Sequence, residues 1–320
     1  MVDSKALEAV YKRSLKLRCG ESCLIVTDTM KEEIGRAFHE YARGITARAD
    51  IAVMAPRNEH AEEPPKEIAE VMLHYDVEIL ITHRSLTHTR ARREATLKGA
   101  RIATMPSVTE DMINRCMDID YDKLRERSLK LCGLLEKASV VRVVTEKGTD
   151  ISFGVSSGSF FGREGGCFDS PGAFGNLPEG EVAFAPETCE GTYVVDASFP
   201  DIGILDSPIT FKTEKGRVIS ILGYRSEEIM ERLEAAGEKA YHVAELGIGL
   251  NPKAKITGNI LEDEKVIGTV HVAVGNDLSF GGTNDVALHL DGVIRAPDIY
   301  LDGAVLMKKG VFRENGLKSS

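Results

Sequence analysis

The 320-residue chain contains no tryptophan, and aromatic residues make up only 6% of it. It therefore offers no large aromatic platform that would point to a particular base or side chain as its ligand. Basic residues are also outnumbered, 40 against 50 acidic ones, and the formal net charge is −10. Because phosphate contacts require clustered Lys and Arg, this balance argues against a nucleic-acid partner. No apolar run is long enough to span a bilayer, so we predict no membrane association.

Cysteine is scarce and irregularly placed. The six cysteines form no C-x-x-C pair and no regular disulfide framework: Cys19, Cys23, Cys116, Cys132, Cys167 and Cys189. Such a pattern favours free thiols in a reducing cytoplasm. Residues 1–18 have the mixed charge of an amphipathic helix rather than the pattern of a signal peptide. We therefore expect a cytoplasmic protein.

The length of the chain favours two domains, which we place at residues 1–137 and 138–320. In the first, apolar runs alternate with helical patterns, which is typical of parallel βαβ units. The predicted strands are residues 23–26, 51–54, 77–81 and 102–105. We expect an α/β domain with a parallel, Rossmann-like sheet. No glycine follows the first strand at residues 27–30, so a dinucleotide or phosphate loop is not indicated.

The second domain has a different sequence pattern, in which short predicted strands are separated by glycine-containing turns. Residues 140–144 and 150–153 are predicted strands, and residues 154–180 are rich in glycine. That glycine-rich stretch fits either a loop that approaches a ligand closely or a surface connection between strands. We expect a mainly β (α+β) domain.

Two histidines and an aspartate lie on strand-like runs of this second domain. Side chains at i and i+2 of a strand share a face, so His289 and Asp291 project together. The same alternation places His271 on one face of its strand and the neighbouring valines on the other. Two imidazoles and a carboxylate among small, apolar neighbours are typical ligands of a divalent metal ion.

Two glutamates in apolar strand patterns extend this set. Glu181 alternates with Val182 and Phe184, and Glu245 lies in a similar apolar run. Charged residues are rarely buried unless they are paired or bind a metal. We therefore predict five metal ligands: Glu181, Glu245, His271, His289 and Asp291.

The acidic run at residues 262–265 precedes the His271 strand. We interpret it as a solvated hairpin turn. The alternative is that it orients His271 through the nitrogen of the ring that faces away from the metal.

Four segments resemble, in the right order, the successive signatures of the thermophilic metallo-aminopeptidases, aminopeptidase T and aminopeptidase S: residues 176–182, 244–247, 271–275 and 289–292. The resemblance implies an α/β domain followed by a β domain with a metal pair of zinc, cobalt or manganese. It also implies a homodimer that acts on small peptides. The five predicted ligands match ligand positions of these enzymes. One position departs: where they have a tyrosine seven residues after the first ligand histidine, this chain has Leu278.

These observations predict, first, a metal-dependent aminopeptidase that removes N-terminal residues from short peptides. Two ions about 3.5–4 Å apart need several carboxylates and lower the pKa of a shared water. Glu181 and Glu245 supply the additional negative charge, and either is a candidate catalytic base.

The alternative is a mononuclear Fe(II) enzyme. His271, His289 and Asp291 form the two-histidine, one-carboxylate set of non-haem iron oxygenases. The same superfamily includes 2,5-dihydroxypyridine 5,6-dioxygenase, which opens a pyridine ring, and the missing tyrosine favours this branch. His88 or His83 would then accept a proton from a phenolic substrate. A purely structural metal is disfavoured, because such sites usually fill all four positions with Cys and His.

Overall fold

The computed structural model describes residues 1–155, 160–313 and 317. The chain divides into two compact units. Unit 1 comprises Met1–Arg125 and Gly166–Glu179, and unit 2 comprises Glu126–Gly165 and Gly180–Ser320. The predicted domain boundary at residue 137 falls in the turn that follows helix α6 (Tyr121–Leu135) and stays a prediction.

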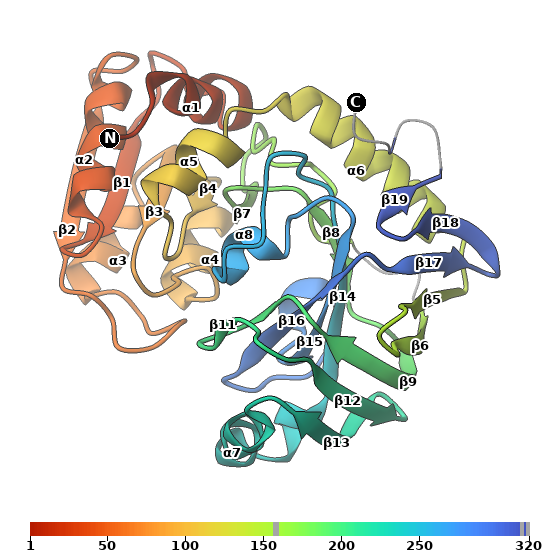
Figure 1. Ribbon diagram of the computed structural model, residues 1–320. Helices are drawn as coiled ribbons and strands as arrows, with labels where there is room; N and C mark the ends of the chain where they lie inside the picture. Colours follow the sequence, from red (N-terminus) through yellow and green to blue (C-terminus); the bar gives the residue numbers. More distant parts are fainter. Residues whose placement is uncertain (156–159, 314–316, 318–320) are drawn as a thin grey trace. The chain divides into compact units, whose positions relative to one another are not determined.

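Unit 1 is built on a five-stranded parallel sheet in the order β2-β1-β3-β4-β7 (Figure 1). Its strands are β1 (Cys23–Asp28), β2 (Ala49–Met54), β3 (Val77–Ile81), β4 (Arg101–Thr104) and β7 (Phe174–Asn176). Its helical segments are α1 (Ser4–Glu8), the π-helix η1 (Ala9–Ser14), α2 (Glu32–Arg43), α3 (Lys66–Met72), α4 (Arg90–Leu97) and α5 (Glu110–Cys116). Every residue of β1 and β3 is buried, as a parallel sheet covered by helices requires. The predicted α/β class is confirmed.

Strand β7 comes from the glycine-rich stretch. It pairs in parallel with β4, so that Phe174 lies opposite Ile102 and Asn176 opposite Thr104. Part of this stretch is therefore neither a ligand loop nor a surface connection. Its pairing partner lies some seventy positions earlier in the sequence, and local pattern carries no information about such a contact.

The described residues of unit 2 form two larger antiparallel sheets and a short one. The eight-stranded sheet has the order β13-β12-β9-β6-β5-β17-β18-β19, the four-stranded sheet has the order β16-β15-β14-β8, and β10 pairs with β11. The strands of the eight-stranded sheet are, in chain order, β5 (Val140–Val144), β6 (Asp150–Gly154), β9 (Thr188–Val195), β12 (Ile209–Glu214), β13 (Arg217–Gly223), β17 (Asp298–Leu301), β18 (Ala304–Lys308) and β19 (Val311–Phe312). The predicted mainly β class of this part of the chain is confirmed.

The four-stranded sheet holds the candidate site. Its strands are β8 (Glu181–Phe184), β14 (Val243–Gly249), β15 (Thr269–Gly275) and β16 (His289–Arg295). The remaining elements are β10 (Ser198–Phe199), β11 (Gly203–Ile204), α7 (Ser226–Ala236), the 3₁₀ helices η2 (Glu238–Tyr241) and η3 (Leu278–Phe280), and α8 (Ile260–Asp263). Strands β8, β14 and β15 are buried throughout, which keeps water away from polar groups placed on them.

The six cysteines are all free, as predicted. Within the described ranges, no helix combines the length and the apolar character that crossing a bilayer would take.

Candidate metal centre

The register of the four-stranded sheet places all five predicted ligands on one face. Ala273 of β15 lies opposite both Glu245 of β14 and Asp291 of β16. Two residues away on the same strands, His271 lies opposite Gly247, and Gly275 lies opposite His289. Glu181 of β8 faces Gly249, which shares a face with Gly247. Because directly opposed residues point to the same side of a sheet, the sheet alone brings the five side chains together.

A glycine makes room for one of the imidazoles. The ring of His271 lies across Gly247, where a Cβ atom would stand 2.0 Å from ring carbon Cε1 and 2.1 Å from Nε2. Any other residue at position 247 would displace the ring. Gly247 therefore lets the imidazole extend over β14 toward the two glutamates.

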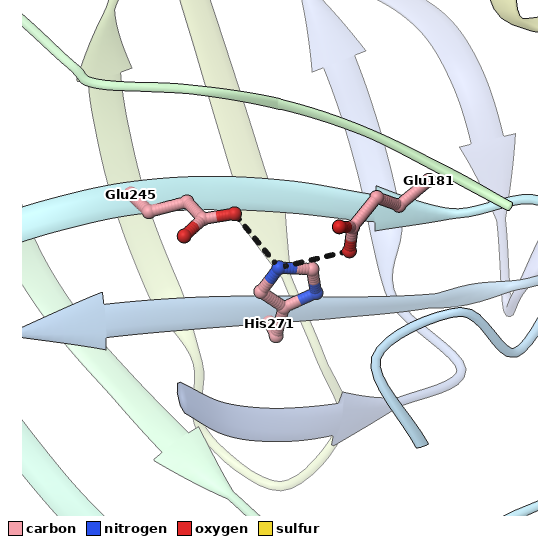
Figure 2. Close-up of side chains that lie close together, drawn as sticks. All are labelled: Glu181, Glu245 and His271. Carbon is pink, nitrogen blue, oxygen red and sulfur yellow. Dashed lines mark hydrogen bonds and ion pairs between the residues drawn. The ribbon is translucent and has the colours of Figure 1, made fainter. Parts of the chain in front are cut away.

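The imidazole of His271 lies between two carboxylates (Figure 2). Its Nε2 is 3.1 Å from Oε1 of Glu245 and 3.4 Å from Oε2 of Glu181. All three side chains are buried. A single N–H cannot serve two acceptors well, so the geometry is better suited to a cation than to a proton.

Glu245 connects this histidine to the other one. Its second oxygen, Oε2, is 3.0 Å from Nε2 of His289, which is also 3.2 Å from Oδ1 of Asp291. The predicted side-by-side arrangement of His289 and Asp291 is confirmed. Strand β16 begins at His289.

The far side of His289 fixes which nitrogen can bind a metal. Its Nδ1 is 2.7 Å from the carbonyl oxygen of Asn276 and must carry the proton to donate to it. In the neutral ring that binds a metal, the lone pair then lies on Nε2, which faces Glu245 and Asp291. Such a hydrogen bond behind the ring is common for metal-binding histidines, because it sets the tautomer and the ring orientation.

The charges of the cluster shift the pKa of its members in the direction expected for mutual stabilisation. Burial by itself lowers the pKa of His271, but the hydrogen bond to Glu245 and the charge of Glu181 raise it to about 9. Burial likewise opposes the charge of His289, and Asp291 and Glu245 raise its pKa well above the ordinary value. Burial raises the pKa of Glu245, but both histidines outweigh it and hold that pKa below the usual range. The carboxylates thus hold positive charge in the imidazoles, a role that a metal ion would take over.

Two further residues extend the cluster. Lys265 is fully buried, and its Nζ lies 2.6 Å from Oε1 of Glu181 and 2.5 Å from Oε1 of Glu264. The interpretation of residues 262–265 as a solvated turn is therefore wrong. Glu262 and Asp263 belong to helix α8, Glu264 and Lys265 follow it directly, and all four residues are buried. The signal that could have revealed this is the apolar pair Val266 and Ile267 directly after the run.

The donor set fits a metal ion. Three groups of potential ligand atoms each lie within 4.8 Å of one another: Glu181, Glu245 and His271; Glu245, His289 and Asp291; Glu264, His271 and Asp291. Donors that bind one ion at about 2.1 Å and at right angles lie about 3.0 Å apart, close to the separations found here. In addition, Oε2 of Glu181 and Nδ1 of His271 are buried and have no hydrogen-bond partner in the described part of the chain.

An aromatic cluster borders the centre. The ring of Phe280 stacks on His289 at 5.4 Å between centroids and 18° between planes. Phe161 meets Phe280 edge-on at a centroid distance of 5.4 Å, and its backbone pairs with Ala183 of β8. Both phenylalanines are partly exposed.

The predicted catalytic residue His88 belongs to unit 1. Its side chain is exposed, it precedes α4, and its carbonyl oxygen accepts a hydrogen bond from Arg93. A catalytic role for His88 stays a prediction.

Comparison with known proteins identifies the family. The family profile described as NicX, 2,5-dihydroxypyridine 5,6-dioxygenase, matches residues 13–314, which is nearly the whole chain. The chain belongs to this family. A curated 2,5-dihydroxypyridine 5,6-dioxygenase from Pseudomonas putida KT2440 is 26% identical over 250 residues, covering 73% of this chain and 70% of the relative.

The solved structures agree on the fold. The 2,5-dihydroxypyridine dioxygenase of Pseudomonas putida KT2440 superposes with a TM-score of 0.82 at 19% identity, covering 98% of both chains. The aminopeptidase AmpT from Thermus thermophilus gives a TM-score of 0.69 at 17% identity, covering 97% of this chain and 98% of that chain. The likeness to AmpT therefore extends to the fold, and the resemblance seen in the sequence was correct to that extent.

The predicted aminopeptidase activity is wrong. The matching family profile and the curated relative are both described as 2,5-dihydroxypyridine 5,6-dioxygenase. The solved structures of AmpT and of the dioxygenase both share this fold, so the fold does not separate the two activities. Leu278, which stands where the aminopeptidases have a tyrosine, agrees with the dioxygenase alternative.

Proposed function

We propose that this protein is a mononuclear non-haem Fe(II) dioxygenase that cleaves a dihydroxylated aromatic ring of the 2,5-dihydroxypyridine type. The observation that carries the proposal is the convergence of two imidazoles and a carboxylate on one face of a buried sheet, in a chain of the dioxygenase family. His271, His289 and Asp291 would hold the ion. When bound, ferrous iron supplies the one-electron chemistry with O₂ that such oxygenation requires.

Glu245 is the residue that organises the centre. Its two oxygens contact Nε2 of both histidines, so it fixes the spacing of the two rings and balances the charge of whatever cation lies between them. The carbonyl of Asn276 fixes the tautomer of His289 from behind. Together these contacts bring two imidazoles and one carboxylate to one face of the sheet and orient the ring of His289 for an ion.

The aromatic cluster beside the centre is consistent with a flat, aromatic substrate. Phe280 already stacks on one ligand ring and Phe161 supports it from the side. A planar pyridine ring placed near His289 would find an apolar, face-on partner there. His88 as the acceptor of a substrate proton, assembly as a homodimer and a cytoplasmic location stay predictions.

The test is oxygen consumption by protein purified under nitrogen and loaded with one equivalent of Fe(II). We expect 2,5-dihydroxypyridine to be consumed with one O₂ per ring, and we expect Zn(II) in place of iron to abolish the reaction. His74 is exposed on the surface of unit 1, so His74→Ala is the matched control for His289→Ala.

The proposal fails if the iron-loaded protein takes up no O₂ with 2,5-dihydroxypyridine, with other dihydroxypyridines or with catechols. It also fails if His289→Ala retains the activity of the His74→Ala control.

A further inference from the structure

A buried lysine lies among the carboxylates of the metal centre. Lys265 has no exposed surface, and its ammonium group contacts one oxygen of Glu181 at 2.6 Å and one oxygen of Glu264 at 2.5 Å. A lysine is almost never buried to this extent unless carboxylates pair with it. The cation is thus a fixed part of the centre.

The contacts of Lys265 are distributed unevenly over the three groups of potential metal ligands. Glu181 belongs to the group with Glu245 and His271, and Glu264 belongs to the group with His271 and Asp291. The third group, formed by Glu245, His289 and Asp291, contains neither partner of the lysine. The ammonium therefore pairs directly with a carboxylate in two of the three groups, and its charge also acts on Asp291, which belongs to the third.

The balance of charges in the centre also favours a single metal ion. Four carboxylates converge here: Glu181, Glu245, Glu264 and Asp291. With all four carboxylates ionised and neutral, metal-binding histidines, one divalent ion plus the ammonium leaves a single negative charge uncompensated. A second divalent ion would leave a net positive charge in a buried site and would lie close to the ammonium, where repulsion is screened only weakly.

We propose that Lys265 is a built-in cation that takes the place of a second metal ion and limits this centre to one. It neutralises Glu181 and Glu264, and the single ion binds to His271, His289 and Asp291, the residues proposed above to hold the iron. Lys265 is then a positioning residue that selects mononuclear over dinuclear chemistry on a fold that also supports a peptidase. This inference rests on the proposed function only in that the proposed enzyme uses a single ion.

The experiment is a titration with Mn(II) under nitrogen, read by elemental analysis of the gel-filtered protein and by electron paramagnetic resonance. We expect the wild type to bind one Mn(II) per chain and to show the spectrum of an isolated ion. We expect Lys265→Met to bind two, with the spectrum of an exchange-coupled pair. Lys265→Arg keeps the positive charge and should return the count to one. Lys239→Met, at an exposed lysine, is the control for the loss of a surface charge.

Two Mn(II) ions bound to the wild type would overturn the proposal, as would a folded Lys265→Met variant that still binds one. If Lys265→Met is insoluble, Lys265→Gln, which keeps polar contacts but loses the charge, takes its place with the same expected counts. The metal count does not depend on turnover. A count of one that rises to two in a protein that fails to oxygenate dihydroxypyridines would reject the proposed function and retain this inference.

Discussion

Both units of the molecule bury glutamates on central strands, but the surroundings of these glutamates differ completely. In unit 1, Glu78 of β3 has no exposed surface, and neither of its carboxylate oxygens has a hydrogen-bond partner among the residues described. Burial raises its pKa well above the ordinary value. In unit 2, Glu245 is buried to a similar degree, yet two histidines hold its pKa below the ordinary range.

The comparison shows that burial of a carboxylate does not by itself mark a functional site. Burial disfavours the negative form of Glu78, because that form would have no partner in an apolar sheet. Glu245 keeps its charge, because the register of the sheet brings His271 and His289 to it. What distinguishes the centre is therefore a set of opposite charges on one face of the sheet. Variants of the centre and of Glu78 test the two halves of this comparison.

The largest effect is expected from removal of a ligand. His289→Ala should reduce iron affinity and turnover by more than about a hundredfold, since loss of groups that merely support metal ligands already costs about 10–100-fold. Iron per chain, measured by elemental analysis, and initial rates of O₂ uptake are the readouts. Iron retained at wild-type level in this variant would show that His289 is not a ligand.

Gly247→Ala tests the space that the sheet leaves for His271. The added Cβ would stand 2.0 Å from the ring, so the imidazole must move away from both glutamates. We expect iron affinity to fall by about 10–100-fold with the fold intact. The matched control is Gly20→Ala, because a Cβ at Gly20 meets nothing within 4 Å. Equal iron affinities in the two variants would contradict the role of Gly247.

The sequence predicted those features of the centre that depend on residues close together in the chain. The period-2 alternation of a strand is local, and it correctly paired His289 with Asp291 and set His271 apart from its valines. Lys265 and Glu264 were missed because a run of charges next to a strand usually lies in solvent, and only the tertiary contact with Glu181 shows otherwise. Strand β7 was missed for the same reason, since its partner β4 is distant in sequence. The choice between peptidase and dioxygenase needed the family comparison, because solved structures of AmpT and of the dioxygenase share this fold.

Glu78→Met tests the other side of the comparison. It removes a buried, unpartnered carboxyl and should stabilise the protein by about 1–3 kcal/mol at neutral pH. Because the pKa of Glu78 is raised in the folded state, its cost to stability grows as pH rises from the ordinary glutamate range toward the folded pKa. The gain should therefore shrink as pH falls toward about 4.

Thermal melts of Glu78→Met and wild type between pH 4 and 8 measure this difference. Glu67 is exposed on α3, so Glu67→Met controls for the loss of a surface charge. A gain that increases toward acid pH would reverse the predicted sign and contradict a raised pKa of Glu78 in the folded state.

The smallest effect is expected for the aromatic cluster. Phe280→Ala should raise KM for 2,5-dihydroxypyridine by about 2- to 10-fold, corresponding to about 0.5–1.5 kcal/mol of stacking. Iron content should not change. Leu278 lies in the same 3₁₀ helix and is 49% exposed, so Leu278→Ala is the control. An unchanged KM in Phe280→Ala would show that the ring of Phe280 does not contact the substrate.

The central claim is that this chain uses iron and O₂ on a dihydroxylated pyridine. The most direct test is turnover of 2,5-dihydroxypyridine by the Fe(II)-loaded protein under ¹⁸O₂, with mass spectrometry of the product. We predict that both atoms of one labelled O₂ appear in a ring-opened product, and that His289→Ala yields none. A product that contains no label, or that takes its oxygen from water, would contradict the account.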